Sequence, residues 1–274
     1  MSAQQLKGVF TALVTPFKDN AVDLDCFEKL CIRQIEAGVA GLVPCGTTGE
    51  TPTLTNEEWN SIISTTVRVS NGRVPVIAGC GTNATASTIA NIQQAKELGA
   101  DAALVVFPYY NKPNRAGLKE HVRLACSVGL PIVLYHVPGR TGQRLNADIL
   151  EELCRTPGVV GLKEATGDVT LGQELVNRLA DTSVSLLSGD DFTYAALVAM
   201  GFDGVISVLS NPEPEQAVAW CNAAATGDIA TLQQLRFELL PLVADLFAET
   251  NPIPCKKIMA KQGLLTYGVR LPLM

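Results

Sequence analysis

Short apolar runs alternate with longer amphipathic stretches along most of the chain. The apolar runs are rich in Val, Ile, Leu and Ala and lack strict alternation with polar residues, which is typical of parallel strands covered on both faces. The pattern predicts eight strands, at residues 8–15, 41–45, 74–79, 102–108, 131–137, 159–163, 184–188 and 204–209.

The stretches between these runs have apolar residues at a spacing near 3.6, which predicts amphipathic helices. A capping-box pattern, Thr55-Asn56-Glu57-Glu58, begins one of them, and Gly38 and Gly99 follow the ends of two others. The predicted helices cover residues 24–37, 55–69, 84–98, 118–127, 146–154, 170–179, 192–200 and 214–225.

Eight consecutive strand–helix units predict an α/β fold with a parallel sheet and helical crossovers. Eight units within about 225 residues favour a (β/α)₈ TIM barrel over a doubly wound sheet. The pattern changes after Gly227, where a long helix over 229–249, despite Pro241, and a shorter one over 255–262 are expected. We therefore expect a catalytic barrel over residues 1–227 and a small helical region over 228–274.

Composition excludes several classes of protein. Hydrophobic residues make up 47% of the 274 residues and charged residues 18%, which is too apolar for a disordered chain. The formal net charge of −6 gives no basic surface for nucleic acid, and no apolar run approaches a membrane span. A secretory signal is not expected, because Gln4, Gln5 and Lys7 stand where such a signal would be apolar.

The cysteines and histidines bear on the cellular compartment and on metal binding. The eight cysteines lie singly in apolar stretches, without a CxxC motif, so they indicate core residues of a reduced, cytoplasmic protein and not a disulfide framework. With only His121 and His136, no metal site is expected.

Lys163 is the most informative polar residue. It follows Val159-Val160-Gly161-Leu162 at the carboxyl end of a predicted strand, the end at which barrel active sites lie. Burial lowers the pKa of a lysine, and a shift from about 10.4 to about 7 requires roughly 4–5 kcal/mol of differential interaction. A neutral amine there would be a nucleophile. The alternative is a lysine just past the strand end that points into solvent.

Other strand ends also carry polar residues. In Gly46-Thr47-Thr48-Gly49-Glu50, glycines and exposed N–H groups could hold a carboxylate, and the lack of a P-loop lysine disfavours a nucleotide triphosphate. The alternative there is a polar turn. Tyr110 and Tyr135 could equally be packing residues, and Arg140 could be a solvated loop residue. For Asp190-Asp191, hydrogen bonding or helix capping is favoured over a metal.

One motif suggests a nucleotide cofactor. Gly79-Cys80-Gly81-Thr82-Asn83-Ala84 matches GxGxxA between a strand and a helix, and Asp101 follows Gly81 by 20 residues. However, Asp101 precedes the next strand and would face the wrong end of the sheet. An NAD-dependent oxidoreductase is therefore a disfavoured alternative.

Taken together, the motifs resemble the dihydrodipicolinate synthase family of the pyruvate-dependent Schiff-base aldolase superfamily, from Gly8 to the end of the chain. Pro138-Gly139-Arg140-Thr141 distinguishes this family from the related sialic-acid lyases. The other motifs that carry the resemblance are Gly46-Thr47-Thr48-Gly49-Glu50, Pro108-Tyr109-Tyr110-Asn111-Lys112-Pro113, Tyr135-His136-Val137, Leu162-Lys163-Glu164-Ala165-Thr166-Gly167, Ser188-Gly189-Asp190-Asp191 and Asn251-Pro252-Ile253-Pro254.

The resemblance implies a carbon–oxygen lyase of lysine and diaminopimelate biosynthesis. Lys163 would form an imine with pyruvate, whose carboxylate would bind Thr47 and Thr48. The derived enamine would add to L-aspartate 4-semialdehyde, and cyclisation would release 4-hydroxy-tetrahydrodipicolinate. No organic cofactor is implied, because the lysine itself serves as the electron sink.

The resemblance also assigns roles to the remaining site residues. Tyr135 would be the acid–base group, positioned by Thr47, and Tyr110 of a neighbouring subunit would complete a proton relay in a homodimer or homotetramer. Arg140 would bind the semialdehyde carboxylate through bidentate contacts. The residues expected to shape the pocket are Gly189 and Ile206. His136 stands where the family usually has Asn, and we expect it to lie behind Tyr135.

Many bacterial relatives are inhibited by lysine bound at the dimer interface. The matching positions here are Thr51, Pro52, Asn56, Trp59, Asn83, Ser87 and Tyr109. Lysine-sensitive relatives have Glu at the position of Ser87 and His at that of Asn56, so weak or absent lysine inhibition is expected.

Two further functional alternatives remain open from the sequence alone. One is another pyruvate-dependent aldolase, of the N-acetylneuraminate lyase or 2-keto-3-deoxy sugar-acid type. The other is a non-catalytic barrel, which the presence of Lys163, Tyr135 and Thr47 argues against.

Overall fold

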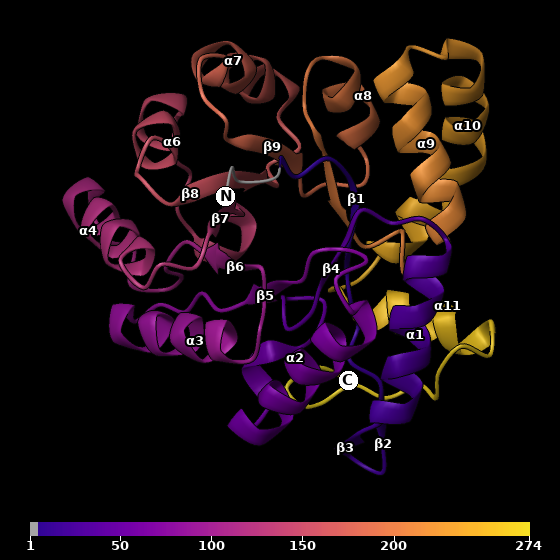
Figure 1. The fold of residues 1–274 in the computed structure, drawn as a ribbon. Coiled ribbons are helices and arrows are strands. Elements are labelled where there is room, and N and C mark those ends of the chain that lie inside the picture. The colour runs from indigo at the N-terminus through magenta and orange to yellow at the C-terminus, as the bar shows by residue number, and fades with distance from the viewer. Residues whose placement is uncertain (1–4) are drawn as a thin grey trace.

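A closed parallel barrel forms the centre of the molecule in the computed structural model, which describes residues 5–274 (Figure 1). The strands hydrogen-bond in the order β4-β1-β10-β9-β8-β7-β6-β5, and every ladder between them is parallel. Their bounds are β1 Gly8–Ala12, β4 Gly41–Val43, β5 Ile77–Gly79, β6 Ala102–Val106, β7 Ile132–His136, β8 Val159–Glu164, β9 Ser185–Ser188 and β10 Gly204–Ser207.

The barrel closes between β4 and β5. Leu42 forms a parallel bridge with Val76, and its N–H donates to the Pro75 carbonyl at 3.0 Å. Gly79 donates to the Pro44 carbonyl at the same distance. The predicted (β/α)₈ TIM barrel is therefore confirmed.

Eight helices surround the strands, one after each (Figure 1). The capping box predicted from the sequence begins the second of them: Thr55 Oγ1 accepts from the Glu58 N–H, and Glu58 Oε2 accepts from the Thr55 N–H. The bounds are α1 Leu24–Glu36, α2 Asn56–Ser70, α3 Thr85–Glu97, α4 Arg115–Cys126, α6 Ala147–Cys154, α7 Val169–Leu179, α8 Tyr194–Ala199 and α9 Pro214–Thr226.

The elements that the sequence did not predict are short. They are the hairpin of β2 (Phe17–Lys18) and β3 (Ala21–Val22), the 3₁₀ turn η1 (Thr51–Thr53) and the single-turn helix α5 (Pro138–Thr141). Segments of two to four residues are too short to show a period. The first strand is also shorter than expected: the Leu13 N–H still donates to the Val43 carbonyl of β4, but the next N–H, that of Val14, donates to the Asn211 side chain.

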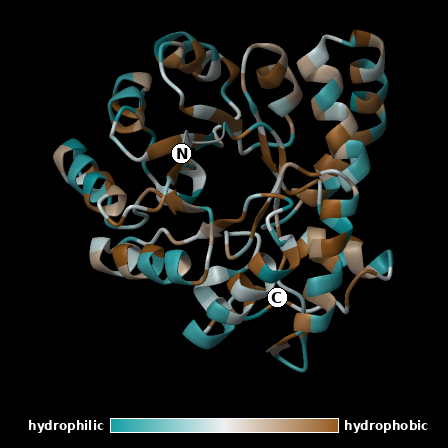
Figure 2. Ribbon diagram, viewed as in Figure 1, coloured by the Kyte–Doolittle hydropathy of each residue, from teal (hydrophilic) through white to brown (hydrophobic). Residues whose placement is uncertain are grey.

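Apolar side chains form two layers, one inside the barrel and one between the strands and the helices. The ribbon of Figure 2 is mostly brown along the strands and mixed teal and brown along the helices, as this arrangement requires. Successive strand residues alternate between them: Leu104 and Tyr135 face the interior, whereas Val105 and Leu134 face the helices. This alternation decides which residues at the carboxyl ends of the strands reach the barrel axis.

Two more helices, α10 (Ile229–Leu246) and α11 (Ile253–Lys261), follow the barrel. α10 buries Leu239, Val243 and Leu246 and includes Pro241, as expected, but it ends three residues earlier than predicted. After α11 the chain returns to α2, where Arg270 pairs with Glu58. The boundary between the barrel and the helical region, placed between residues 227 and 228, stays a prediction.

Within residues 5–274, no helix combines the length and the apolar character that crossing a bilayer requires. Gln4, used in the argument about the N-terminus, lies outside the described residues.

Candidate active site

A cavity of about 440 Å³ opens at the carboxyl ends of the strands. Lys163, near the end of β8, lies in its wall together with residues from the loops after β4 and β7. The structure thus brings together most of the predicted site residues: Thr47, Thr48, Tyr135, Arg140, Lys163 and Gly189.

Lys163 points into the barrel and not into solvent, being only 6% exposed. It is paired in register with Tyr135 on β7, and its Nζ lies 4.3 Å from the centre of the Tyr135 ring. Burial lowers the pKa of Lys163 to about 8, with Arg140 adding to the shift and Asp191 opposing it. About a tenth of this amine is therefore uncharged and nucleophilic at pH 7.

Gly189 makes room for the Lys163 side chain. A Cβ at position 189 would lie 2.7 Å from Lys163 Cε and 2.6 Å from the Ala165 Cβ. Any larger residue would displace the lysine from this orientation, so glycine is required here by contact with the nucleophile.

Tyr135 is a buried phenol next to that amine. Burial raises its pKa, whereas the positive charge of Arg140 and a hydrogen bond with the Thr47 side chain lower it. The phenol consequently stays protonated at neutral pH and can donate a proton to a group in the cavity.

The loop after β4 presents two threonines. Its shape is set by two turn bonds, from the Gly49 N–H to the Gly46 carbonyl and from the Glu50 N–H to the Thr47 carbonyl, both at 3.1 Å. Thr48 is buried, and its Oγ1 accepts a hydrogen bond from Asn251 Nδ2 at 2.9 Å.

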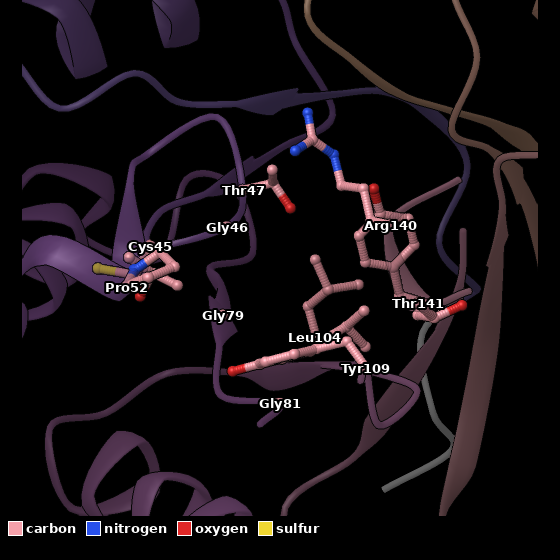
Figure 3. Close-up of a pocket in the computed structure, with 13 residues that line it drawn as sticks. Cys45, Gly46, Thr47, Pro52, Gly79, Gly81, Leu104, Tyr109, Arg140 and Thr141 are labelled. Carbon is pink, nitrogen blue, oxygen red and sulfur yellow. The ribbon is translucent and has the colours of Figure 1, made fainter. Parts of the chain in front are cut away.

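A second cavity of about 260 Å³ adjoins the first and shares Thr47, Tyr135 and Arg140 with it (Figure 3). Arg140 lies on α5 with its guanidinium exposed, and Figure 3 shows it beside Thr47. Within residues 5–274 its side chain makes a single hydrogen bond, to the Asn251 carbonyl at 3.3 Å. Most of the guanidinium fork is thus available to a carboxylate.

Two polar residues at the site have roles that the sequence reasoning did not assign. Asn251 lines the larger cavity and contacts both Thr48 and Arg140. Asp191 is buried and accepts hydrogen bonds from Ser207 Oγ and from the Val208 and Leu209 N–H groups. Hydrogen bonding by Asp191 was expected, but its charge effect on Lys163 depends on strand packing and could not be read from the sequence.

Two predicted residues lie away from this cavity. Ile206 is buried in the barrel interior, whereas Val208, two residues further on, lines the cavity. Tyr110 is 89% exposed and contributes to neither cavity of this chain.

His136 lies behind Tyr135 and is fully buried. Its Nε2 accepts the Leu145 N–H at 3.1 Å, so the ring hydrogen is on Nδ1, which lies 3.2 Å from Glu164 Oε1. The ring is therefore held on both sides and lines neither cavity.

The GxGxxA motif has a packing explanation. A Cβ on Gly79 would lie 2.0 Å from the Cys45 carbonyl oxygen, and one on Gly81 would lie 2.3 Å from the Val106 nitrogen. Both glycines are needed where neighbouring strands approach closely. Asp101 accepts from the Val76 N–H, ahead of β6 and at the opposite end of the barrel from the site. Across residues 5–274, no group of His, Cys, Asp and Glu side chains could hold a metal ion.

A third cavity, of about 370 Å³, is lined by five of the residues expected at a regulatory site: Thr51, Pro52, Asn56, Trp59 and Tyr109. Every residue that lines it is uncharged. Asn83 and Ser87 are outside the lining, and Ser87 is exposed. The cavity thus offers a ligand ammonium no carboxylate.

Comparison with known proteins decides the family. Residues 5–274 match the model of the dihydrodipicolinate synthetase family. The chain belongs to this family. Proteins named 4-hydroxy-tetrahydrodipicolinate synthase from Methanoculleus marisnigri and Thermodesulfovibrio yellowstonii are 44% and 46% identical to it. These matches cover 97% of this chain and 93% and 92% of the respective relatives.

Solved structures of family members agree with this assignment. The dihydrodipicolinate synthase of Thermotoga maritima superposes with a TM-score of 0.96 at 40% identity, covering 99% of this chain and 93% of the other. The Acinetobacter baumannii enzyme, solved with pyruvate, gives 0.95 at 44% identity, covering 98% and 93%. The family resemblance read from the sequence is confirmed, and the matches favour it over the sugar-acid aldolase, oxidoreductase and non-catalytic alternatives.

We expect free L-lysine to be a poor inhibitor of this family member. The uncharged third cavity cannot compensate a buried ammonium, and a missing charge partner typically costs several kcal/mol. A titration of lysine against initial rate tests this. Half-inhibition below a millimolar concentration would contradict it, whereas Ser87→Glu should increase sensitivity.

Proposed function

We propose that the chain is a 4-hydroxy-tetrahydrodipicolinate synthase, which condenses pyruvate with L-aspartate 4-semialdehyde. The observation that carries the proposal is the buried Lys163 amine, whose pKa is lowered to about 8 and which faces Tyr135 in the cavity. The names of the relatives support the same activity.

The first half of the reaction uses the Lys163 amine and the threonine loop, Gly46-Thr47-Thr48-Gly49-Glu50, which follows β4. Neutral Lys163 attacks the ketone carbon of pyruvate, and loss of water leaves an imine, with Thr47 and Thr48 binding the carboxylate. The protonated imine acidifies the methyl group, and removal of one methyl proton gives the enamine. Tyr135 is the group placed to transfer these protons, because it lines the cavity beside Lys163 and its phenol interacts with the Thr47 side chain.

The second half uses Arg140. The enamine carbon bonds to the aldehyde carbon of the semialdehyde, whose oxygen takes up a proton to become the hydroxyl. The amino group of the semialdehyde then attacks the imine carbon and expels the Lys163 amine, closing the ring. One water is released overall, the lysine is regenerated, and no organic cofactor or metal is required. Arg140 binds the semialdehyde carboxylate with its free guanidinium nitrogens.

Assembly is part of the proposal. Tyr110 is 89% exposed with a φ of 72°, a conformation that a non-glycine residue rarely adopts without external support. We place this ring in the active site of a neighbouring subunit, in a homodimer or homotetramer. A variant of one structural relative is described as monomeric, so the contacts that hold such assemblies can be broken in this family.

We also assign the enzyme to the cytoplasm. All eight cysteines are free, and six of them are buried, as suits a reducing compartment.

Covalent trapping tests the nucleophile. Borohydride reduction in the presence of pyruvate should modify Lys163 and inactivate the protein, and Lys163→Ala should abolish the adduct. Because the pKa of Lys163 is about 8, the rate of imine formation should rise with pH through 8 as the neutral amine becomes populated. Mass mapping of the peptides identifies the site. Modification of Lys112 or Lys256 instead would refute the mechanism.

Tyr135→Phe tests the proton transfer. It keeps the ring but removes the hydroxyl, so kcat should fall by roughly 10²–10⁴-fold without loss of the fold. Thr47→Val should have a similar effect, since it removes the hydrogen-bond partner of Tyr135. Steady-state kinetics alongside circular dichroism measure both. If each variant lost less than about threefold in kcat, the tyrosine would be a packing residue only.

Arg140→Met tests the substrate. Loss of a hydrogen-bonded charge typically weakens binding by about 10–100-fold, so KM for the semialdehyde should rise by that factor while KM for pyruvate changes less. Arg144→Met is the matched control, because Arg144 pairs with Asp168 on the surface. Equal effects of Arg140→Met on both substrates would show that Arg140 is structural.

A further inference from the structure

A buried ion pair stands at the end of the threonine loop. Lys256 Nζ lies 2.6 Å from Glu50 Oε1, and the two side chains are 0% and 1% exposed. The other carboxylate oxygen, Oε2, accepts the Arg270 N–H at 3.0 Å. Both oxygens of Glu50 are thus held by residues from the end of the chain.

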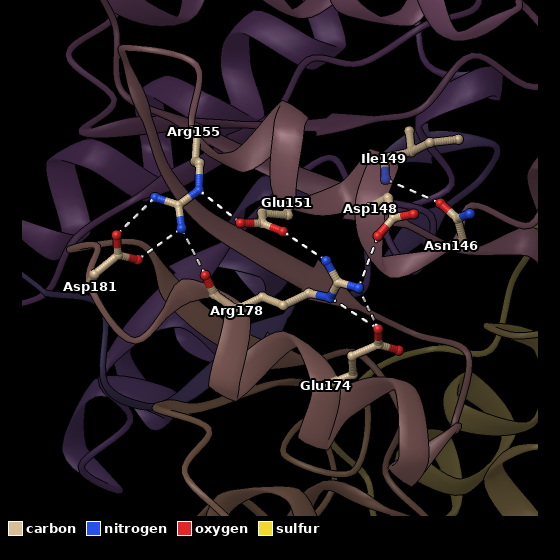
Figure 4. Close-up of polar contacts among 8 residues, drawn as sticks. All are labelled: Asn146, Asp148, Ile149, Glu151, Arg155, Glu174, Arg178 and Asp181. Carbon is tan, nitrogen blue, oxygen red and sulfur yellow. Dashed lines mark hydrogen bonds and ion pairs between the residues drawn. The ribbon is translucent and has the colours of Figure 1, made fainter.

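The pair differs from the exposed ion pairs of the molecule. The helices α6 and α7, for example, are joined by a surface network (Figure 4). The members of this network are Asp148, Glu151, Arg155, Glu174, Arg178 and Asp181. Exposed ion pairs of this kind each contribute little to the free energy of unfolding. A fully buried pair requires desolvation of both charges, and apolar residues of similar volume are often as stabilising. Stability alone is therefore a weak reason for this arrangement.

Glu50 controls the loop through its backbone as well. It has a left-handed φ of 53°, its N–H donates to the Thr47 carbonyl, and its carbonyl accepts from both the N–H and Oγ1 of Thr53. A left-handed non-glycine residue carries strain, so its conformation depends on contacts made by its side chain. Movement of Glu50 would shift Thr47 directly.

The surroundings make the carboxylate position rigid. The Phe17 ring has Lys256 Nζ at 4.1 Å and the Arg270 guanidinium at 4.3 Å from its centre. Arg270 also binds both carboxylate oxygens of Glu58, at the start of α2, at 2.7 and 2.6 Å. Neither Glu50 nor Lys256 lines the two site cavities, so neither is placed to touch a substrate.

We propose that the buried Glu50–Lys256 ion pair is a positioning element that holds Thr47 and Thr48 for the carboxylate of pyruvate. The helical region after the barrel is then part of the binding machinery, acting through Lys256 of α11. This inference rests on the proposed function, which assigns pyruvate to the threonine loop.

Lys256→Met should act mainly on pyruvate. It leaves the Glu50 carboxylate without its principal partner, and the loop relaxes. KM for pyruvate should rise about tenfold or more, and kcat should fall as well because Thr47 also contacts Tyr135, whereas KM for the semialdehyde, which Arg140 sets, should change by less than about threefold. Lys261→Met is the matched control, because Lys261 is an exposed lysine on the same helix and should leave all constants unchanged.

A double variant separates the role of the pair from folding. Glu50→Gln with Lys256→Met removes both charges and leaves no unpaired one, so the melting temperature should stay near that of the parent. The charged contact is still lost, and KM for pyruvate should remain raised. If Lys256→Met does not fold, the double variant decides.

The readouts distinguish this inference from the proposed function. If the parent protein formed no borohydride-trapped pyruvate adduct on Lys163, the proposed function would fail. If the parent formed the adduct but the folded double variant kept a pyruvate KM within about twofold, the inference alone would be overturned. An equal loss in every kinetic constant would also overturn it, because that outcome marks a general structural role.

Discussion

The burial of one amine inside an apolar barrel is the constraint on which the site depends. Lys163 occupies an interior-facing position that strand alternation would otherwise fill with an aliphatic side chain. Its surroundings follow from that position. Gly189 leaves space for the lysine because it has no side chain, and the Tyr135 ring on the neighbouring strand packs against the Lys163 amine. The negative charge of Asp191 favours the protonated form of that amine. Desolvation still dominates, so the amine is a nucleophile near neutral pH.

In the proposed reaction, the two substrate carboxylates bind to elements far apart in sequence. The threonines follow β4 and Arg140 follows β7, and Asn251 bridges them by contacting Thr48 and Arg140. The barrel thus supplies the reactive groups, while the chain that follows it sets their mutual position. Glu50 shows the same arrangement: it belongs to the barrel, but its two carboxylate oxygens are bound by Lys256 and Arg270 from the chain that follows the barrel.

Periodicity in the sequence was enough to predict the eight strand–helix units, because parallel strands and amphipathic helices leave strong patterns. It was not enough for η1 and α5, which are too short to show a period, although both border the site. Lys163, Tyr135 and Thr47 could be found because they stand at strand ends. Asn251 and Lys256 act from a region with no strand register to place them, and the partner of a buried charge has no signature in local sequence. The glycines at 79 and 81 looked like a nucleotide-binding motif, since tight strand packing and phosphate binding both select for glycine.

The closure of the barrel is uneven, and this affects how the loops of the site are connected to one another. β4 is joined to β1 by a ladder of three residue pairs but meets β5 at a single bridge, Leu42 with Val76. The threonine loop after β4 is therefore connected to Lys163 of β8 through the continuous hydrogen-bonded strands β1, β10 and β9. The seam between β4 and β5 has the fewest paired residues of the barrel, one bridge against two or more in every other ladder. Close approach of Gly79 to the Cys45 carbonyl holds the wall together there, so a side chain at position 79 would part the wall directly beside the threonine loop.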